Sequence, residues 1–209
     1  MKGLLLKDFY LISKYCRAFL FIMAVFIGVS FLGEGNLFFA FYPCIISGML
    51  PMTLIAYDER DNWNAYAGGL PYTKAQMVSV KYLIGLSTSA LILTAVAITE
   101  ACRMVSDQSF LLSSYLIFLM TLLSICLLVP ALMLPFVFKF GAEKGRIIYY
   151  VVIIIACAGS ALLTSGDKTS PFLLSKTGMG CAFVICFASV LLYCISWLLS
   201  IYFYKRREV

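Results

Sequence analysis

Histidine is absent from this sequence, and charge is scarce, since only 12% of its 209 residues are charged. Without histidine, a His-ligated metal site and the Ser–His and zinc-protease mechanisms are excluded. The phosphate-binding loop G-x-x-x-x-G-K-[ST] is also missing, so the chain has no P-loop for ATP. An aspartyl mechanism inside a membrane requires two carboxylates at that depth, and only Glu100 approaches this description. These absences argue against an enzyme, and we expect no cofactor or metal in this chain.

Most residues of the sequence are apolar. They make up 63% of the chain, and the charged fraction is about half of the ~25% usual in soluble domains. A membrane-spanning helix needs about 20 apolar residues, within a range of about 17–25. Six uncharged runs have roughly this length: residues 18–33, 35–57, 82–99, 108–138, 147–166 and 177–204. The sequence therefore predicts an all-α integral membrane protein, one domain over residues 1–209 with six transmembrane helices.

The fourth run, residues 108–138, is too long for one straight span and too short for two. Pro130 and Pro135 lie near its end, and a proline inside a helix removes a hydrogen bond and bends or breaks the helix. We expect one span followed by a kinked or broken cytoplasmic extension.

The distribution of lysine and arginine predicts the orientation. If both termini lie inside, only Arg103, Lys168 and Lys176 of the 16 basic residues face outward. Because the inner segments of membrane proteins carry the excess of Lys and Arg, both termini and residues 58–81 are predicted to be cytoplasmic. The net charge of +6 is explained by this topology and does not indicate a nucleic-acid partner.

Residues 2–17 are predicted to form an amphipathic helix on the inner membrane surface. The basic face consists of Lys7, Tyr10, Lys14 and Arg17. The apolar face consists of Leu5, Phe9, Ile12 and Cys16. Two such faces at helical spacing are typical of an interfacial helix. The segment also suits a continuation of the first span, and a bend near residues 15–18 reconciles the two interpretations.

The longest polar interval, residues 58–81, forms an elbow between the second and third predicted spans. A helix is expected to begin at Asp58 and to end at Gly68-Gly69, because glycine adopts the positive φ of a helix end without steric cost. Thr73 and Gln76 then have the spacing of a capping box, in which each side chain binds the other residue's backbone N–H. Tyr72 and Met77 occupy the positions of a hydrophobic staple around that box.

Three large apolar side chains in this elbow, Trp63, Tyr66 and Leu70, leave apolar surface on a segment that should face water. Surface of this kind marks interaction sites, so the elbow is predicted to dock a soluble partner. Acidic residues between positions 58 and 61 add charge that a helix N-terminus favours and that would steer a basic partner. The alternative is an ordered surface loop without a partner.

Two features lie on the predicted outer side. Glu100 and Arg103 are one helical turn apart near the outer end of the third span, which favours an ion pair at the membrane edge over a functional carboxylate. The last outer loop, residues 165–177, contains an apolar turn predicted to dip into the outer leaflet. This turn consists of Pro171, Phe172, Leu173 and Leu174.

One motif in the elbow combines Tyr57-Asp-Glu-Arg60 and Trp63 with Leu70-Pro-Tyr-Thr-Lys-Ala-Gln76 and Lys81-Tyr82. It resembles the permease subunit of bacterial type-2 ABC exporters, and more narrowly the small permeases that export phenol-soluble modulins and related antimicrobial peptides. The six-span plan, the N-terminal interfacial helix and the outer loop between the last two spans also match that family.

The resemblance implies a multi-pass protein of the bacterial cytoplasmic membrane whose elbow contains a coupling helix. This helix would insert into a cleft of a separate cytoplasmic ATPase, which binds ATP and Mg²⁺. Two permeases, either two copies or a paralogue pair, would work with two ATPases. The residues implied to contact the ATPase are Asp58, Glu59, Arg60, Trp63, Tyr66 and Leu70. Those implied to hold the elbow's shape are Leu70, Pro71, Thr73 and Gln76.

Two functions therefore remain open. The first is an exporter permease, for which the resemblance alone favours an amphipathic peptide as substrate, ahead of lipids or hydrophobic drugs. The second is a non-transporting membrane sensor or immunity protein that docks a cytoplasmic partner through the same elbow. Co-purification of an ATPase with permease-dependent ATP turnover distinguishes them.

Overall fold

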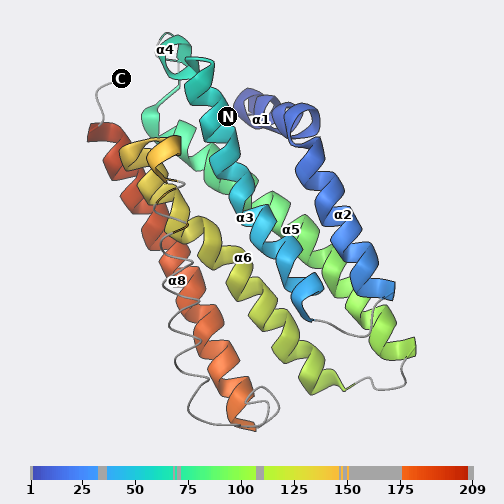
Figure 1. The fold of residues 1–209 in the computed structure, drawn as a ribbon. Helices are drawn as coiled ribbons and strands as arrows, with labels where there is room; N and C mark the ends of the chain where they lie inside the picture. The colour runs from blue at the N-terminus through green and yellow to red at the C-terminus, as the bar shows by residue number, and fades with distance from the viewer. Residues whose placement is uncertain are drawn as a thin grey trace.

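The structure is a computed structural model that describes residues 2–32, 37–67, 69, 72–106, 111–145, 147, 150 and 176–206. The regular structure in these residues is helical, and no strand occurs among them. In chain order the helices are α1 (Lys2–Tyr15), α2 (Arg17–Leu32), α3 (Leu37–Arg60), α4 (Trp63–Ala67), α5 (Lys74–Ser106), α6 (Leu112–Phe140) and α8 (Lys176–Arg206). Figure 1 shows a bundle of long helices with α1 lying across one end.

Four of the helices are long and apolar enough to cross a membrane. They are Phe39–Arg60, Lys74–Ser106, Leu112–Phe140 and Gly180–Arg206. The bent pair Gly3–Tyr15 and Arg17–Ser30 makes a fifth if it is counted as one span. These helices agree with an all-α membrane protein, but the predicted count of six is not confirmed. The predicted span at 147–166 lies almost wholly outside the described residues.

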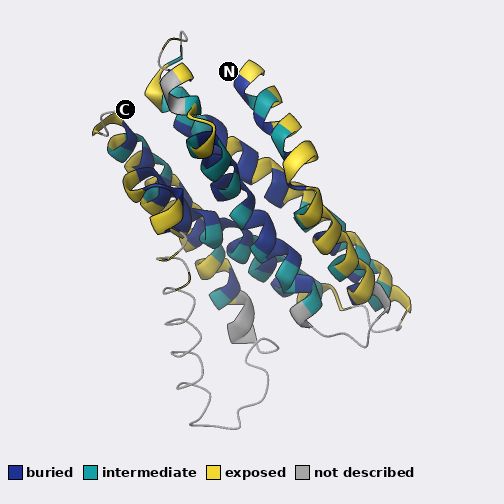
Figure 2. Cartoon of the chain, turned by 45° about the horizontal axis from the view of Figure 1, so that its top comes forward, coloured by how far each residue is buried: buried dark blue, intermediate teal, exposed yellow. Residues whose placement is uncertain are grey.

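α3 lies at the middle of the bundle, where it packs against α2, α5 and α6. The most apolar stretch of α3 has 61% of its residues buried inside the protein, whereas that of α8 has 22%. Figure 2 shows that the buried residues, in dark blue, gather where the helices face one another. Gly48 permits the close approach of α3 to α6, because a Cβ at this position would lie 2.7 Å from Val129 Cγ1. Any larger residue at position 48 would therefore push the two helices apart.

The prolines expected to kink or break the fourth span do not break it. α6 runs continuously from Leu112 to Phe140 and contains both Pro130 and Pro135. Proline is tolerated inside membrane helices where neighbouring helices satisfy or bury the backbone groups that it frees. Pro130 is buried, and Ala131 and Leu134 beside it belong to the core cluster that α6 shares with α8.

α1 and α2 meet at Cys16 with a bend of 71°, which confirms the bend predicted near residues 15–18. The side of α1 that faces the other helices consists of Leu4, Asp8, Ile12 and Cys16, so it includes two residues of the predicted apolar face. Phe9, expected on the apolar face, is 61% exposed. Asp8 lies on the buried side because it faces basic partners on α5 and on α1 itself.

The short helix α4, the helix α1 and the C-terminal ends of α6 and α8 lie at one end of the bundle, which we call the elbow end (Figure 1). The C-terminal ends of α2 and α5 lie at the opposite end. The two chain ends and the elbow are therefore on the same side of the molecule, as the predicted topology requires.

Candidate functional site

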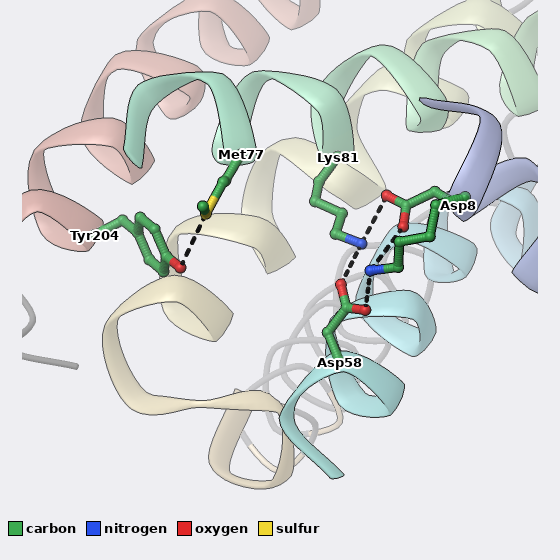
Figure 3. A network of polar contacts seen from close by, with 6 residues as sticks. Asp8, Asp58, Met77, Lys81 and Tyr204 are labelled. Carbon is green, nitrogen blue, oxygen red and sulfur yellow. Dashed lines mark hydrogen bonds and ion pairs between the residues drawn. The ribbon is translucent and has the colours of Figure 1, made fainter. Parts of the chain in front are cut away.

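Four charged side chains form a closed ring at the base of the elbow, where α1, α3 and α5 meet (Figure 3). Lys81 Nζ lies 2.7 Å from Asp8 Oδ2 and 2.6 Å from Asp58 Oδ2. Lys7 Nζ lies 2.5 Å from Asp58 Oδ1 and 3.5 Å from Asp8 Oδ1, which closes the ring. Each carboxylate faces two ammonium groups, and the formal charges cancel. We call these four residues the ion ring.

The ion ring is largely shielded from solvent. The exposed fraction of the side chain is 3% for Asp8, 8% for Asp58 and 9% for Lys81, and only Lys7, at 25%, is partly open. Removing a charge from water costs several kcal/mol of free energy. The attraction to a buried partner of opposite charge offsets this cost only when the geometry of the pair is good. The alternating charges balance one another only when all four are in place, and the Lys7–Asp8 contact is the weakest of the four, since Asp8 Oδ1 accepts no hydrogen bond from any described residue. The ring therefore fixes the positions of α1 and α5 relative to the end of α3.

The elbow helix begins later than the sequence predicts. Asp58 and Glu59 belong to the last turn of α3, which extends to Arg60. In the turn that follows, Asn62 has a φ of 50°, a left-handed conformation that asparagine tolerates better than most residues. α4 then begins at Trp63. The carboxylates of Asp58 and Glu59 thus lie at a helix C-terminus, where the helix dipole disfavours negative charge, so the predicted dipole stabilisation is wrong for these two residues. For Asp58, the ring ammonium groups supply the stabilisation instead.

Two aromatic residues on α4 lie together but have different surroundings. The ring centroids of Trp63 and Tyr66 are 5.3 Å apart, as expected for residues on one helix face. Lys7 Nζ lies 3.9 Å from the centre of the Trp63 ring, a cation–π contact, and Trp63 also packs against the core cluster that contains Leu4. Tyr66 is 66% exposed. Trp63 therefore joins α4 to the ion ring, whereas Tyr66 is the aromatic surface that α4 leaves open.

The predicted capping box is present at the start of α5. The Thr73 N–H donates to Gln76 Oε1 at 3.1 Å, and the Gln76 N–H donates to Thr73 Oγ1 at 3.3 Å. These bonds satisfy backbone donors that a helix N-terminus leaves free. Leu70 and Pro71, implied to shape the same part of the elbow, lie outside the described residues.

The two residues of the predicted staple serve different neighbours. Tyr72 packs against the core cluster of α1, and a Cβ added to Gly3 would lie 3.5 Å from its hydroxyl oxygen. Met77 packs against the cluster shared by α6 and α8, and Tyr204 donates a hydrogen bond to its sulfur at 3.8 Å (Figure 3). The entry of the chain into α5 is therefore held on one side by α1 and on the other by α8.

The end of α3 is also tied to the segment that follows α6. The Glu59 carboxylate accepts the Ala142 N–H at 2.8 Å. Just before Ala142, Gly141 ends α6 with a φ of 89°, and its N–H donates to Val137 O at 2.8 Å. Glycine takes this φ without steric cost, so the chain turns sharply enough for Ala142 to reach Glu59.

The ion pair predicted at the opposite end of the bundle is confirmed. Arg103 Nη2 lies 2.7 Å from Glu100 Oε2. The structure adds a link that the sequence did not predict, since the Ser30 hydroxyl of α2 donates to Glu100 Oε1 at 3.1 Å. Glu100 is 3% exposed and therefore joins α2 to α5 from a buried position.

The structure gives no support for two other kinds of site, an outer-loop turn and a metal centre. The predicted outer-loop turn of Pro171, Phe172, Leu173 and Leu174 lies outside the described residues. In the part of the chain that the structure describes, no group of three or more His, Cys, Asp or Glu is placed to hold a metal ion. The elbow with its ion ring is the candidate functional site.

Sequence reasoning placed Asp58 on the elbow surface and missed its partners. A signal was present, because Asp8 is the first acidic residue and no other precedes Glu34. Lys81 directly precedes an uncharged run of membrane length. Isolated charges of this kind need partners when they are buried. The pairing itself was not readable, since Lys7 and Asp58 are 51 residues apart and Asp8 and Lys81 are 73 apart.

Comparison with known proteins indicates the family of this chain. Residues 3–205 match the family model described as ABC-2 family transporter protein. No curated protein and no solved structure matches the chain. The family match spans nearly all of the sequence and implies a membrane and an ABC ATPase as partner. The chain therefore belongs to the ABC-2 transporter family, as a multi-pass permease component of an ABC transporter.

Proposed function

We propose that this permease exports an amphipathic peptide from the bacterial cytoplasm, driven by a separate ATPase chain that binds the elbow. Two permeases, either two copies or a paralogue pair, work with two ATPases, which bind ATP and Mg²⁺. The position of α4 is the main support for placing the docking site at the elbow. This helix lies at the elbow end with Tyr66 exposed, next to the ion ring that holds the neighbouring helices in place. The elbow motif's resemblance to peptide exporters favours a peptide as substrate.

The charge distribution supports a cytoplasmic elbow. Basic residues in the helices and turns of the elbow end are Lys2, Lys7, Lys14, Arg17, Arg60, Lys74, Lys81, Lys139, Lys144, Lys205 and Arg206. Near the opposite end the described basic residues are Arg103 and Lys176. Since cytoplasmic segments of membrane proteins are the basic ones, both termini and α4 belong on the cytoplasmic side, where an ATPase can reach them.

The exposure and contacts of the elbow residues support a division of roles among them. Arg60 and Tyr66 are exposed and are assigned to direct contact with the ATPase. Asp58 is committed to the ion ring, Glu59 binds Ala142, and Trp63 packs on Lys7, so we assign these three to positioning the contact surface. Rigid support of this kind lowers the entropy cost of binding, because the surface does not have to be ordered by the partner.

The test is the affinity of the ATPase for permease variants in detergent. Tyr66→Ala should weaken binding by about 2 kcal/mol, roughly 30-fold, if Tyr66 is an anchor at the interface. The matched control is Tyr10→Ala on α1, because Tyr10 is 68% exposed and Tyr66 is 66% exposed. Trp63→Ala should weaken binding to a similar extent by releasing α4 from its support, and it should also lower the permease's own stability.

If Tyr66→Ala and Tyr10→Ala both bind the ATPase like the parent chain, the elbow is not the docking site. The site would then have to be sought in residues 139–146 or in α1. If Tyr66→Ala abolishes ATPase binding while the permease keeps its thermal stability, the contact role of Tyr66 is supported.

A further inference from the structure

A cavity of about 840 Å³ opens at the elbow end between α2, α3, α6 and residues 141–144. Its volume falls within the roughly 300–1,000 Å³ typical of small-molecule and cofactor sites. α3 supplies one wall, along which lining residues recur from Met49 to Arg60. With a rise of about 1.5 Å per residue, this wall is about 16 Å long. The cavity is therefore long enough to take several residues of a peptide along α3.

The character of the wall changes along this length. Met49 and Met52 of α3 and Met133 of α6 line the part farther from the elbow. Methionine is unbranched and polarisable, so a wall built from it adapts to apolar groups of different shape. Arg60 and Lys144 lie at the other end, toward the elbow. The cavity thus joins an apolar interior to a charged opening, and it matches an amphipathic ligand.

The opening carries both signs of charge. Arg60, Glu143 and Lys144 line it and are exposed, and none of them forms an ion pair within the described residues. Glu59, which lies deeper on the wall, accepts a hydrogen bond from Ala142. A ligand with acidic and basic groups can therefore pair with the opening without displacing the contacts that hold the elbow.

We propose that this cavity binds the transported substrate, and that the substrate is an amphipathic peptide. Its apolar side chains lie against the methionines, and its charged groups pair with Glu143 and Lys144, which leaves Arg60 free to contact the ATPase. Mixed charge at the opening favours a peptide over an anionic phospholipid, whose phosphate would pair with Lys144 and leave Glu143 without a partner. The proposal rests on the proposed export function, and it places the substrate beside the elbow that the ATPase drives.

The first test identifies what occupies the cavity. A photoreactive amino acid in place of Thr53, which lines the wall, is activated in the full-length permease in nanodiscs. The probe is a fluorescent synthetic helix of leucine, lysine and glutamate, about 18 residues or five turns long. Crosslinking to this peptide is the expected result. Crosslinking only to phospholipid, only to a second permease copy, or only to another part of the same chain overturns the proposal.

The second test measures peptide affinity by fluorescence anisotropy. Ala56 lines the cavity, so Ala56→Trp should fill it and lower affinity at least about tenfold, whereas Ala90→Trp on the exposed side of α5 should change nothing. Lys144→Glu should lower peptide affinity about three- to tenfold in low salt and by a smaller factor in high salt. Its control is Lys205→Glu, because Lys205 is exposed and does not line the cavity. Equal affinity in Ala56→Trp and the parent protein overturns the proposal.

ATPase binding to the same nanodiscs is measured separately. Peptide binding that depends on position 56, without any ATPase binding, contradicts the export function and leaves the peptide site standing. In the opposite case the ATPase binds and its ATP turnover depends on the permease, but the residue at position 56 does not affect peptide affinity. That result supports the export function and contradicts the peptide site.

Discussion

Removing the Lys81 ammonium group tests whether the ion ring holds the elbow in place. The Lys81 side chain is 9% exposed, and its Nζ lies within 2.7 Å of carboxylate oxygens on both α1 and α3. In Lys81→Met, Asp8 and Asp58 remain buried with only Lys7 between them. Breaking a buried ion pair by removing one partner costs about 3–5 kcal/mol, because it leaves an uncompensated charge. We expect a loss of this size in the free energy of unfolding.

The assay is reversible unfolding in mixed detergent micelles, with unfolding followed by tryptophan fluorescence. Lys205→Met is the matched control, since Lys205 is exposed at the end of α8 and its loss should cost less than about 0.5 kcal/mol. The double variant Asp8→Leu with Lys81→Met removes one charge of each sign and leaves Lys7 paired with Asp58. It should be more stable than either single variant, because replacing both members of a buried pair by apolar groups is often neutral.

Two outcomes would refute this reasoning. In the first, Lys81→Met loses no more stability than Lys205→Met, which would mean that the ring is open to water or not formed. In the second, the double variant loses the sum of the two single effects, which would show that Asp8 and Lys81 do not interact.

Three further predictions concern the rest of the chain. Thr73→Ala should cost about 1 kcal/mol of local stability through the lost cap, measured as faster hydrogen exchange in the first turn of α5. In a cysteine-free background, an impermeant reagent on intact cells should label a cysteine at Lys168 and not one at Asn62, and the reverse pattern rejects the orientation. Glu100→Gln should lower the free energy of unfolding by about 1–3 kcal/mol, because it loses the ion pair to Arg103, and Ser30→Ala should lower it by about 1 kcal/mol. If Glu100→Gln is as stable as the parent protein, the buried pair is contradicted.

Local features of this structure could be predicted from the sequence. The capping box of Thr73 and Gln76 depends on a spacing of three residues, and the Glu100–Arg103 pair depends on the same spacing. The bend at Cys16 follows from a change between an amphipathic and a uniformly apolar segment. In the two side-chain pairs the interacting groups lie within one helical turn, so helix geometry alone determines whether they meet.

Features that depend on distant contacts could not be predicted in this way. The pattern of α1 placed Lys7 on a basic face and indicated no partner for Asp8, whereas the structure pairs Lys7 with Asp58 and Asp8 with Lys81. Likewise, nothing in the polar sequence around Asp58 showed that α3 continues to Arg60. Both outcomes depend on which helices lie side by side, and a single sequence does not contain that information.

The contacts at the base of the elbow determine how a force on α4 would spread through the permease. Lys7 is shared, since its ammonium group pairs with Asp58 and also lies over the Trp63 ring. A displacement of Trp63 therefore acts on the ion ring, and through the ring on α1 and α5. Glu59, the residue after Asp58, binds the backbone beyond α6. Movement of α4 should thus be passed to α1, α5 and the end of α6 together. The substrate cavity proposed above lies between the last of these and α3, so its opening would change shape as the elbow moves.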